Sequence, residues 1–307
     1  MILLTLFTAP KPFTNPHISL IQRNALRSWK ALGDQVEVVM IGDEPGMADV
    51  ALELGIRHIP HVETNDLGTP LLSSIFELGR GVNDSPFLAY VNADIVLFPD
   101  LIENLENIAA QKKKFLIAGE RWDLAVKEPI VIDDNWQVSL LKILSIQGKL
   151  HGKYGSDYFI YPRDCFTILP EFAVGRAGWD NWMIFHARQQ RWAVIDATNV
   201  IKVVHQDHDY SHLPGGQRHY KLPETDVNVK LAGGKRSIFT LKDASHYVDG
   251  KKVKKKKLTW HKFWREVEIF PLVKLRSHSL GWLTFAIFHP KKAYAELRTG
   301  LISPSNR

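Results

Sequence analysis

The sequence predicts an α/β fold in which a mixed, mainly parallel sheet is flanked by helices and followed by a C-terminal helical, aromatic-rich appendage. Over the first two thirds of the chain, short apolar or β-branched runs alternate with longer segments of helical periodicity. The run FLAYV at residues 87–91 is apolar throughout, which is typical of a strand covered on both faces. With 307 residues, 45% of them apolar, the chain can bury one large core or a core with a small appendage.

Each element follows from a local pattern. The apolar start of the chain predicts a strand at residues 2–7 instead of a signal peptide. Ile18, Ile21, Ala25 and Trp29 recur at helical spacing and predict a helix over about residues 15–32, before Gly33-Asp34. The further strands are expected at residues 36–41, 56–62, 87–91, 115–118 and 158–161, with helices at 47–54 and 70–79. We place the domain boundary at residue 222, between domain 1–222 and appendage 223–307.

Polar residues stand next to several of the predicted strands. Asp43 follows the second strand, Asn92-Ala93-Asp94 follows the run 87–91, Glu120 follows 115–118, and Asp157 precedes 158–161. Ligands of open α/β sheets bind beyond the carboxyl ends of the strands, so Asp43, Asp94 and Glu120 are expected to face one crevice. Because Mg²⁺ and Mn²⁺ prefer oxygen ligands, Asp94 suits a metal shared with substrate phosphates. The alternative is an aspartate that serves only a turn.

Two other segments carry candidate chemistry. VVHQDHDYSH contains His205, His208 and His212, whose spacing could bind zinc on a helix, but Val203-Val204 indicates a strand end and no glutamate stands where a zinc protease needs one. Histidines of a polar loop are the alternative. In AGWDNWMIFHAR, Asp180 stands where a helix begins and could cap its backbone N–H groups.

The apolar strand that runs into Asn92-Ala93-Asp94, about ninety residues after an N-terminal strand, resembles the D-x-D region of family-2-like GT-A glycosyltransferases, over roughly residues 1–215. The resemblance implies a Rossmann-like fold, a UDP- or GDP-sugar donor and a Mn²⁺ or Mg²⁺ ion. It implies that Asp94 binds the metal and that His205, or secondarily His208, completes the metal shell. Asn92 departs from the family's pattern, since it stands where the motif has its first acid. The amide keeps hydrogen bonding and loses a charge.

The resemblance also suggests roles for the other candidates. Asp180 matches the base that deprotonates an acceptor hydroxyl in inverting enzymes. Asp43 matches the position that often holds the uracil or ribose. Asp157 would line the sugar or acceptor pocket, and Arg121 or Arg163 would neutralise the diphosphate. The alternatives are turn residues for the two aspartates and solvated side chains for the arginines.

We therefore expect a metal-dependent, inverting glycosyltransferase whose acceptor is a hydroxyl of a glycan, a lipid-linked molecule or a protein. A sugar-nucleotide pyrophosphorylase is a rival within the same fold, and it carries a glycine-rich loop after the first strand. Residues 8–12, TAPKP, contain no glycine that would let backbone amides approach a triphosphate.

Charge and cysteine content indicate which partners and which cellular compartment to expect for the protein. The net charge is +6, and six lysines lie between Lys251 and Lys257, without which 33 basic residues balance 33 acidic ones. This local excess argues against a specific nucleic-acid binder and allows peripheral membrane contact through residues 251–290. A membrane- or nucleic-acid-binding protein that acts through this segment is the rival of another class. The single cysteine, Cys165, favours the cytoplasm, with contact at the inner membrane face.

Overall fold

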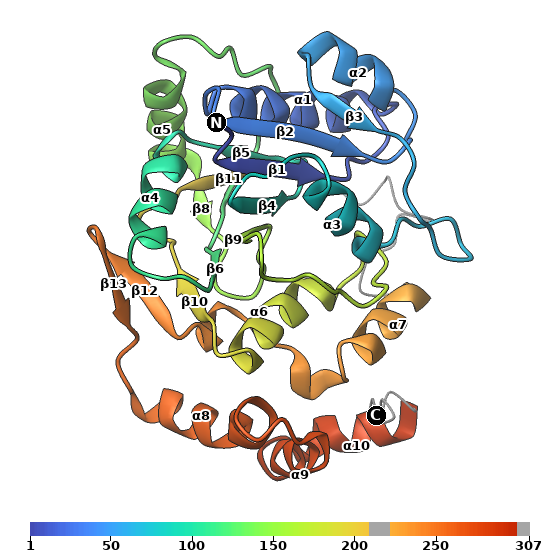
Figure 1. Cartoon of the computed structure of the whole chain (residues 1–307), viewed down its shortest axis with the longest axis vertical. Coiled ribbons are helices and arrows are strands. Elements are labelled where there is room, and N and C mark those ends of the chain that lie inside the picture. Colours follow the sequence, from blue (N-terminus) through green and yellow to red (C-terminus); the bar gives the residue numbers. More distant parts are fainter. Residues whose placement is uncertain (209–221, 300–307) are drawn as a thin grey trace.

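The computed structural model describes residues 1–208 and 222–299. Within them, nine strands form one sheet in the order β13-β12-β10-β6-β9-β4-β1-β2-β3 (Figure 1). Their bounds are β1 (Leu4–Thr8), β2 (Val36–Ile41), β3 (Arg57–Ile59), β4 (Phe87–Val91), β6 (Phe115–Ala118), β9 (Tyr158–Pro162), β10 (Ala193–Asp196), β12 (His246–Asp249) and β13 (Lys252–Lys255). A second sheet, in the order β5-β11-β7-β8, contains β5 (Ile95–Leu97), β7 (Trp122–Leu124), β8 (Lys149–Leu150) and β11 (Val203–Gln206).

Helices cover both faces of the large sheet (Figure 1). Their bounds are α1 (Pro16–Lys30), α2 (Met47–Leu54), α3 (Leu72–Arg80), α4 (Asp100–Ala109), α5 (Trp136–Gln147), α6 (Trp179–Gln189), α7 (Pro223–Leu231), α8 (Trp260–Val273), α9 (His278–Phe288) and α10 (Pro290–Thr299), with 3₁₀ turns at Lys235–Ser237 and Leu241–Asp243. No helix of the described residues combines the length and the apolar character needed to cross a bilayer.

Alternation along β4 explains why its sequence is apolar throughout. Leu88 and Tyr90 join the core cluster that contains residues of α3 and α6, whereas Ala89 and Val91 join the cluster beneath α1, α2 and α4. Both faces of this strand are therefore buried, as the sequence predicts.

Strand directions bring the predicted site residues to one edge of the sheet. β1 pairs in parallel with β2 and β4, and β6 pairs in parallel with β10. β9 lies between β4 and β6 and is antiparallel to both. The carboxyl ends of β1, β2, β4 and β6 therefore meet the amino end of β9, where Asp157 stands.

The chain beyond residue 222 contributes to the same sheet. β12 pairs in parallel with β10, and β13 follows it as an antiparallel edge strand that contains three of the six lysines of the run. Lysines on an edge strand oppose pairing with another chain, which gives part of this run a structural explanation. The domain boundary at residue 222 remains a prediction, and the large sheet extends past it.

The strands at residues 36–41, 87–91 and 115–118 and the helix at 47–54 agree with the predicted bounds. The first strand begins at Leu4 instead of residue 2, and the third covers only Arg57–Ile59. The small sheet was not predicted, because its strands are two to four residues long and carry no clear alternation.

Candidate functional site

The tripeptide Asn92-Ala93-Asp94 lies where the chain leaves one sheet and enters the other. β4 ends at Val91 in the large sheet, and β5 begins at Ile95 in the small one. The indole N–H of Trp29, in α1, donates to the carbonyl of Ile95 at 2.8 Å, which fixes this crossing from inside the core. Asp94 is 7% exposed, so its carboxylate is held in a buried turn.

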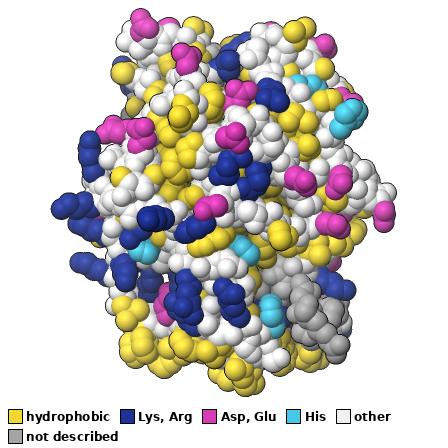
Figure 2. All heavy atoms as spheres, viewed as in Figure 1, with side chains coloured by type: hydrophobic (Ala, Val, Ile, Leu, Met, Phe, Trp, Pro, Cys, Tyr) yellow, Lys and Arg dark blue, Asp and Glu magenta, His cyan; other side chains and the backbone are white. Residues whose placement is uncertain are grey.

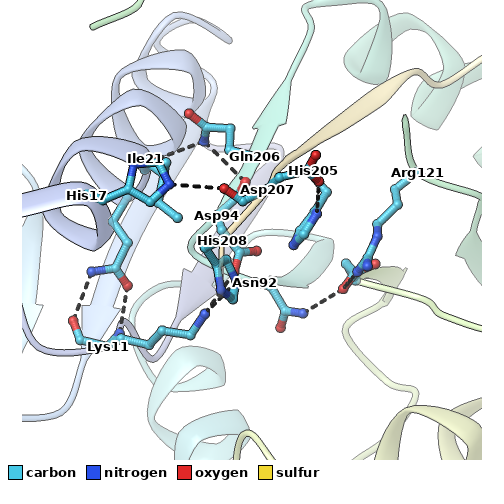
Figure 3. A network of polar contacts seen from close by, with 12 residues as sticks. Lys11, His17, Ile21, Asn92, Asp94, Arg121, His205, Gln206, Asp207 and His208 are labelled. Atoms are coloured by element: carbon cyan, nitrogen blue, oxygen red, sulfur yellow. Dashed lines mark hydrogen bonds and ion pairs between the residues drawn. The ribbon is translucent and has the colours of Figure 1, made fainter. Parts of the chain in front are cut away.

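β11 brings both described histidines of the cluster to Asp94. β11 is antiparallel to β5, with His205 opposite Ile95, and the backbone N–H of Gln206 donates to the carbonyl of Asp94 at 3.2 Å. His208 follows two residues after the strand, and its Nε2 lies 3.2 Å from Oδ2 of Asp94 (Figure 3). His212 lies outside the described residues.

Lys11 completes a compact triangle with Asp94 and His208 (Figure 3). Its Nζ lies 3.1 Å from Oδ2 of Asp94 and 3.0 Å from Nε2 of His208. Burial alone would raise the pKa of Asp94, but the charge of Lys11 and the contacts with His208 and His205 hold that pKa well below its usual value. Asp94 is therefore ionised at neutral pH and faces positive charge.

His205 stands between Asp94 and two further carboxylates. Its Nδ1 lies 3.2 Å from Oδ1 of Asp123 and 3.6 Å from Oδ1 of Asp207. Burial alone would lower the pKa of His205, whereas Asp123 and Asp207 raise it to about 9. A carboxylate at one ring nitrogen orients the ring so that the other can serve as a ligand, and a metal bound there would displace a proton.

This donor set fits a divalent cation. One ligand atom from each of Asp94, His205 and His208 lies within 4.8 Å of the others. Two ligands at right angles around an ion about 2.1 Å away stand about 3 Å apart, close to the 3.2 Å between Asp94 and His208. Asp123, His205 and Asp207 form a second such group that shares His205.

Several buried polar atoms near this edge have no hydrogen-bond partner among the described residues; they include Oδ1 of Asp94, Oδ2 of Asp157, Oγ1 of Thr8 and Nδ1 of His205. Leaving a buried polar atom unpaired costs about 1–3 kcal/mol, and more for a charged one. Such atoms at the carboxyl ends of β1 and β4 and the amino end of β9 mark a place where a ligand would supply the missing partners.

Asn92 does not face Asp94 as a second acid would, because its side chain is engaged with Asp157. Its Nδ2 donates to Oδ1 of Asp157 at 2.9 Å, and Nη1 of Arg121 donates to the same oxygen at 2.7 Å. Nε of Arg121 also donates to Oδ1 of Asp123 at 3.0 Å. Two carboxylates therefore already balance the charge of Arg121, and its contact with a diphosphate remains a prediction.

Asp180 is the second residue of α6, not its N-cap as the capping interpretation required. The cap residue is Gly178, with a positive φ of 110°, and Oδ1 of Asp180 accepts its backbone N–H at 3.2 Å. Burial, with a smaller contribution from the charge of Asp157, raises the pKa of Asp180 to about 6. The contribution of Asp157 means that its carboxylate lies close enough to Asp180 to act on its ionisation.

The remaining candidates lie farther from the triangle. Asp43 is exposed at the end of β2, two strands from β4, which corresponds to about 10 Å. Glu120 lies 3.7 Å from Nζ of Lys153. The diphosphate role suggested for Arg163 is wrong, because its guanidinium donates to the carbonyls of Arg80 and Ser85 at the opposite, amino end of β4.

Two residues that contact the site were not selected from the sequence. Lys11 lies in the TAPKP loop after β1, and its position after a buried strand was a signal that this loop reaches the same crevice. Asp123 lies in β7, opposite His205 in the parallel pairing of β7 with β11. No sequence pattern indicates this pairing, because the two strands are about eighty residues apart.

Comparisons with known proteins show the fold. No protein-family model and no curated protein sequence matches the chain. Residues 1–349 of Staphylococcus aureus TarS, solved with UDP-GlcNAc, superpose with a TM-score of 0.50 at 14% identity, covering 98% of this chain and 84% of that one. Mannosyltransferase PcManGT from Pyrobaculum calidifontis, solved with GDP-Man and Mn²⁺, gives 0.44 at 13% identity, covering 97% and 79%. Mycobacterium tuberculosis glucosyl-3-phosphoglycerate synthase, solved with Mn²⁺, UDP and glucosyl-3-phosphoglycerate, gives 0.44 at 12% identity, covering 84% and 88%.

The chain therefore has the GT-A fold, as its resemblance at Asn92-Ala93-Asp94 implied. At 14% identity, the likeness shows a shared arrangement of helices and strands and no more than that.

Proposed function

We propose that this chain is a metal-dependent glycosyltransferase that moves a sugar from a nucleoside-diphosphate donor to an acceptor hydroxyl, with inversion at the anomeric carbon. The observation that carries the proposal is the pair of buried carboxylate oxygens without a partner, on Asp94 and Asp157, beside His205 and His208. A cation and a polar ligand would supply the partners that these two oxygens lack, because a buried polar atom without a hydrogen bond is costly. The likeness to a structure of the same fold that was solved with UDP-GlcNAc supports this assignment.

Asp94, His205 and His208 would hold a Mn²⁺ or Mg²⁺ ion. When bound, such an ion neutralises the developing charge of a leaving nucleoside diphosphate. Lys11 adds a positive charge at the same place, since its Nζ lies 3.1 Å from Asp94. Arg121 holds the carboxylate of Asp157 in place through a 2.7 Å hydrogen bond.

The donor would extend along the carboxyl edge of the sheet. Asp43, exposed at the end of β2, would contact the uracil or ribose. Asn92 would offer the donor its side-chain amide oxygen, Oδ1, because its Nδ2 already donates a hydrogen bond to Asp157. The free Oδ2 of Asp157 would accept a hydroxyl of the sugar or the acceptor.

Asp180 would act as the general base. With a pKa of about 6, its carboxylate is mostly ionised at pH 7 and basic enough to take a proton from an approaching hydroxyl. Direct attack by that hydroxyl on the anomeric carbon would expel the nucleoside diphosphate and invert the configuration. The acceptor would be a hydroxyl of a glycan, a lipid-linked molecule or a protein. The buried, free Cys165 accords with the expected cytoplasmic location.

A thermal-shift screen of UDP- and GDP-sugars, each with and without Mn²⁺, tests the proposal, because a ligand of the folded state raises the melting temperature. We expect a metal-dependent shift with one donor and its loss in Asp94→Ala. Asp164→Ala is the matched control, since this aspartate lies just after β9, at the amino end of β4. No shift with any donor, or equal shifts in Asp94→Ala, would refute the proposal.

A further inference from the structure

The three C-terminal helices and the connection between α8 and α9 leave large apolar side chains exposed. Eleven such residues are between 39% and 70% exposed: Trp260, Phe263, Trp264, Val267, Phe270, Leu275, Leu280, Leu283, Ile287, Tyr294 and Leu297. We call them the aromatic face. Figure 2 shows hydrophobic side chains gathered at the end of the molecule that α8–α10 form in Figure 1.

Helical spacing explains how α8 exposes one apolar side and buries another. Trp260, Trp264 and Val267 recur at intervals of four and three residues, so they lie on one side of the helix. Ile269 and Leu272 lie on the other side and pack in the core cluster beneath the sheet. A helix that is apolar on both sides is usually buried on both sides. We therefore expect the exposed side of α8 to be covered by a binding partner.

The same pattern continues in α9. Leu280, Leu283 and Ile287 recur at intervals of three and four residues and are exposed, whereas Phe285 is buried against the rest of the protein. With 11 residues, α9 is too short to span a bilayer, which takes about 20 apolar residues. Such a helix can lie along a surface instead of crossing it.

The exposed charged side chains of the segment that carries the aromatic face have one sign. Within residues 260–298 the acidic residues are half-buried or buried, and each is paired: Glu266 with Arg188, Glu268 with Arg265, and Glu296 with Arg236. The exposed charged residues of this segment are all basic: Lys274, Arg276, Lys291, Lys292 and Arg298. Figure 2 shows Lys and Arg side chains in a band next to the hydrophobic end.

We propose that the aromatic face docks onto the headgroup region of an anionic lipid bilayer, with the basic residues at the phosphates and the aromatic side chains at the acyl boundary. Tryptophan and phenylalanine beside lysine and arginine, on helices that lie flat, suit that boundary. Anionic lipid headgroups complement the positive charge around the face. A second copy of the chain would bring two surfaces of the same sign together, which opposes self-association through this face. The proposal does not depend on the transferase activity.

Co-sedimentation of the full chain with vesicles tests the proposal. We expect binding to vesicles of phosphatidylglycerol and phosphatidylcholine and much weaker binding to phosphatidylcholine alone. The double change Trp260→Ser and Ile287→Ser should weaken binding by about tenfold or more, since it removes two large apolar side chains from the contact. Leu52→Ser with Ile146→Ser is the matched control, because these residues are 84% and 73% exposed on α2 and α5.

The basic residues have their own test. Lys291→Gln with Lys292→Gln should weaken vesicle binding and reduce its dependence on salt, whereas Lys142→Gln with Lys149→Gln, at exposed positions in and after α5, should leave it unchanged. All eight positions are exposed, so thermal unfolding verifies that each variant folds.

Three results would overturn the proposal. The first is equal binding by the Trp260→Ser, Ile287→Ser variant and its control. The second is a dimer in sedimentation velocity that this variant dissociates, with no binding to vesicles. The third is binding to duplex DNA or RNA without binding to anionic vesicles.

Discussion

Replacing Lys11 with methionine should have opposite effects on metal binding and on nucleotide binding. Its ammonium lies 3.1 Å from Oδ2 of Asp94 and 3.0 Å from Nε2 of His208, two of the proposed metal ligands. An incoming divalent cation must displace that ammonium. After it leaves Asp94, the ammonium of Lys11 would stay close to the ion, where it could pair with a diphosphate.

The size of both effects follows from the contacts. At 3.1 Å, an effective dielectric of about 20 gives an attraction of about 5 kcal/mol between Lys11 and Asp94. The Lys11 side chain is 30% exposed, so solvent screening and desolvation reduce the net value to about 1 kcal/mol. Lys11→Met should therefore tighten Mn²⁺ binding about fivefold. Loss of a charge-assisted contact worth about 1.5–3 kcal/mol should weaken UDP or GDP binding about 10- to 150-fold.

Titration of Mn²⁺ alone, followed by EPR of the free ion, measures the first effect, and calorimetric titration of UDP or GDP at saturating Mn²⁺ measures the second. Lys114→Met is the matched control, because Lys114 forms an ion pair with Asp164 just before β6, at the opposite edge of the sheet. Weaker Mn²⁺ binding in Lys11→Met, or unchanged nucleotide binding, would contradict the displacement of Lys11.

Transfer should accelerate as the pH rises through about 6, because only the ionised carboxylate of Asp180 can accept a proton and its pKa is about 6; a pH profile of kcat/KM that is flat across this range would return Asp180 to a structural role. The folded protein holds the proton of Asp180 more tightly than the unfolded chain does, so the free energy of unfolding falls as the pH rises from about 4 to 6. Asp180→Asn should therefore raise the melting temperature at pH 8 relative to wild type. The same change should abolish transfer. Asn92→Asp should lower the free energy of unfolding by about 1–3 kcal/mol without metal, because an amide donor becomes a carboxylate facing another carboxylate, and urea titration measures the loss; equal stability would show that the amide bond is dispensable. Gly79→Ala should destabilise the fold by about 1–3 kcal/mol, because its Cβ would stand 2.6 Å from the buried ring of Phe7, whereas Gly81→Ala meets nothing closer than 3.5 Å; equal urea midpoints would contradict this packing.

The elements with continuous apolar runs were predicted well from the sequence. Residues 87–91 form a strand with the predicted bounds because both of its faces are buried, so burial alone fixes its pattern. The edge on which Asp43, Asp94 and Glu120 stand also follows from the alternation of strands and helices.

The contacts of the site depend on pairings that the sequence does not reveal. His205 comes next to Asp94 because β11 pairs with β5, a strand of three residues. Asp123 orients His205 because β7 pairs with β11 on the other side. Since strands this short carry too few residues for a hydrophobic period, Asp123 was not selected although its pairing places it opposite His205.

Asn92 was interpreted as a weakened acid of the metal motif, and its contacts give another reason for the amide. An aspartate there could not donate to Asp157, which already holds Arg121. The single acid Asp94 is instead surrounded by two histidines and a lysine. The charged side chains of this site therefore differ from those that a two-acid motif would use.

Pulsed EPR of Mn²⁺ bound together with UDP or GDP examines the proposed metal site without relying on turnover. We predict one bound ion whose spectrum shows coupling to imidazole nitrogen, weaker coupling in His208→Ala, and loss of the bound ion in Asp94→Ala. An ion that binds equally well in Asp94→Ala, or that shows no nitrogen coupling in the wild-type protein, would contradict the assignment of Asp94, His205 and His208 as its ligands.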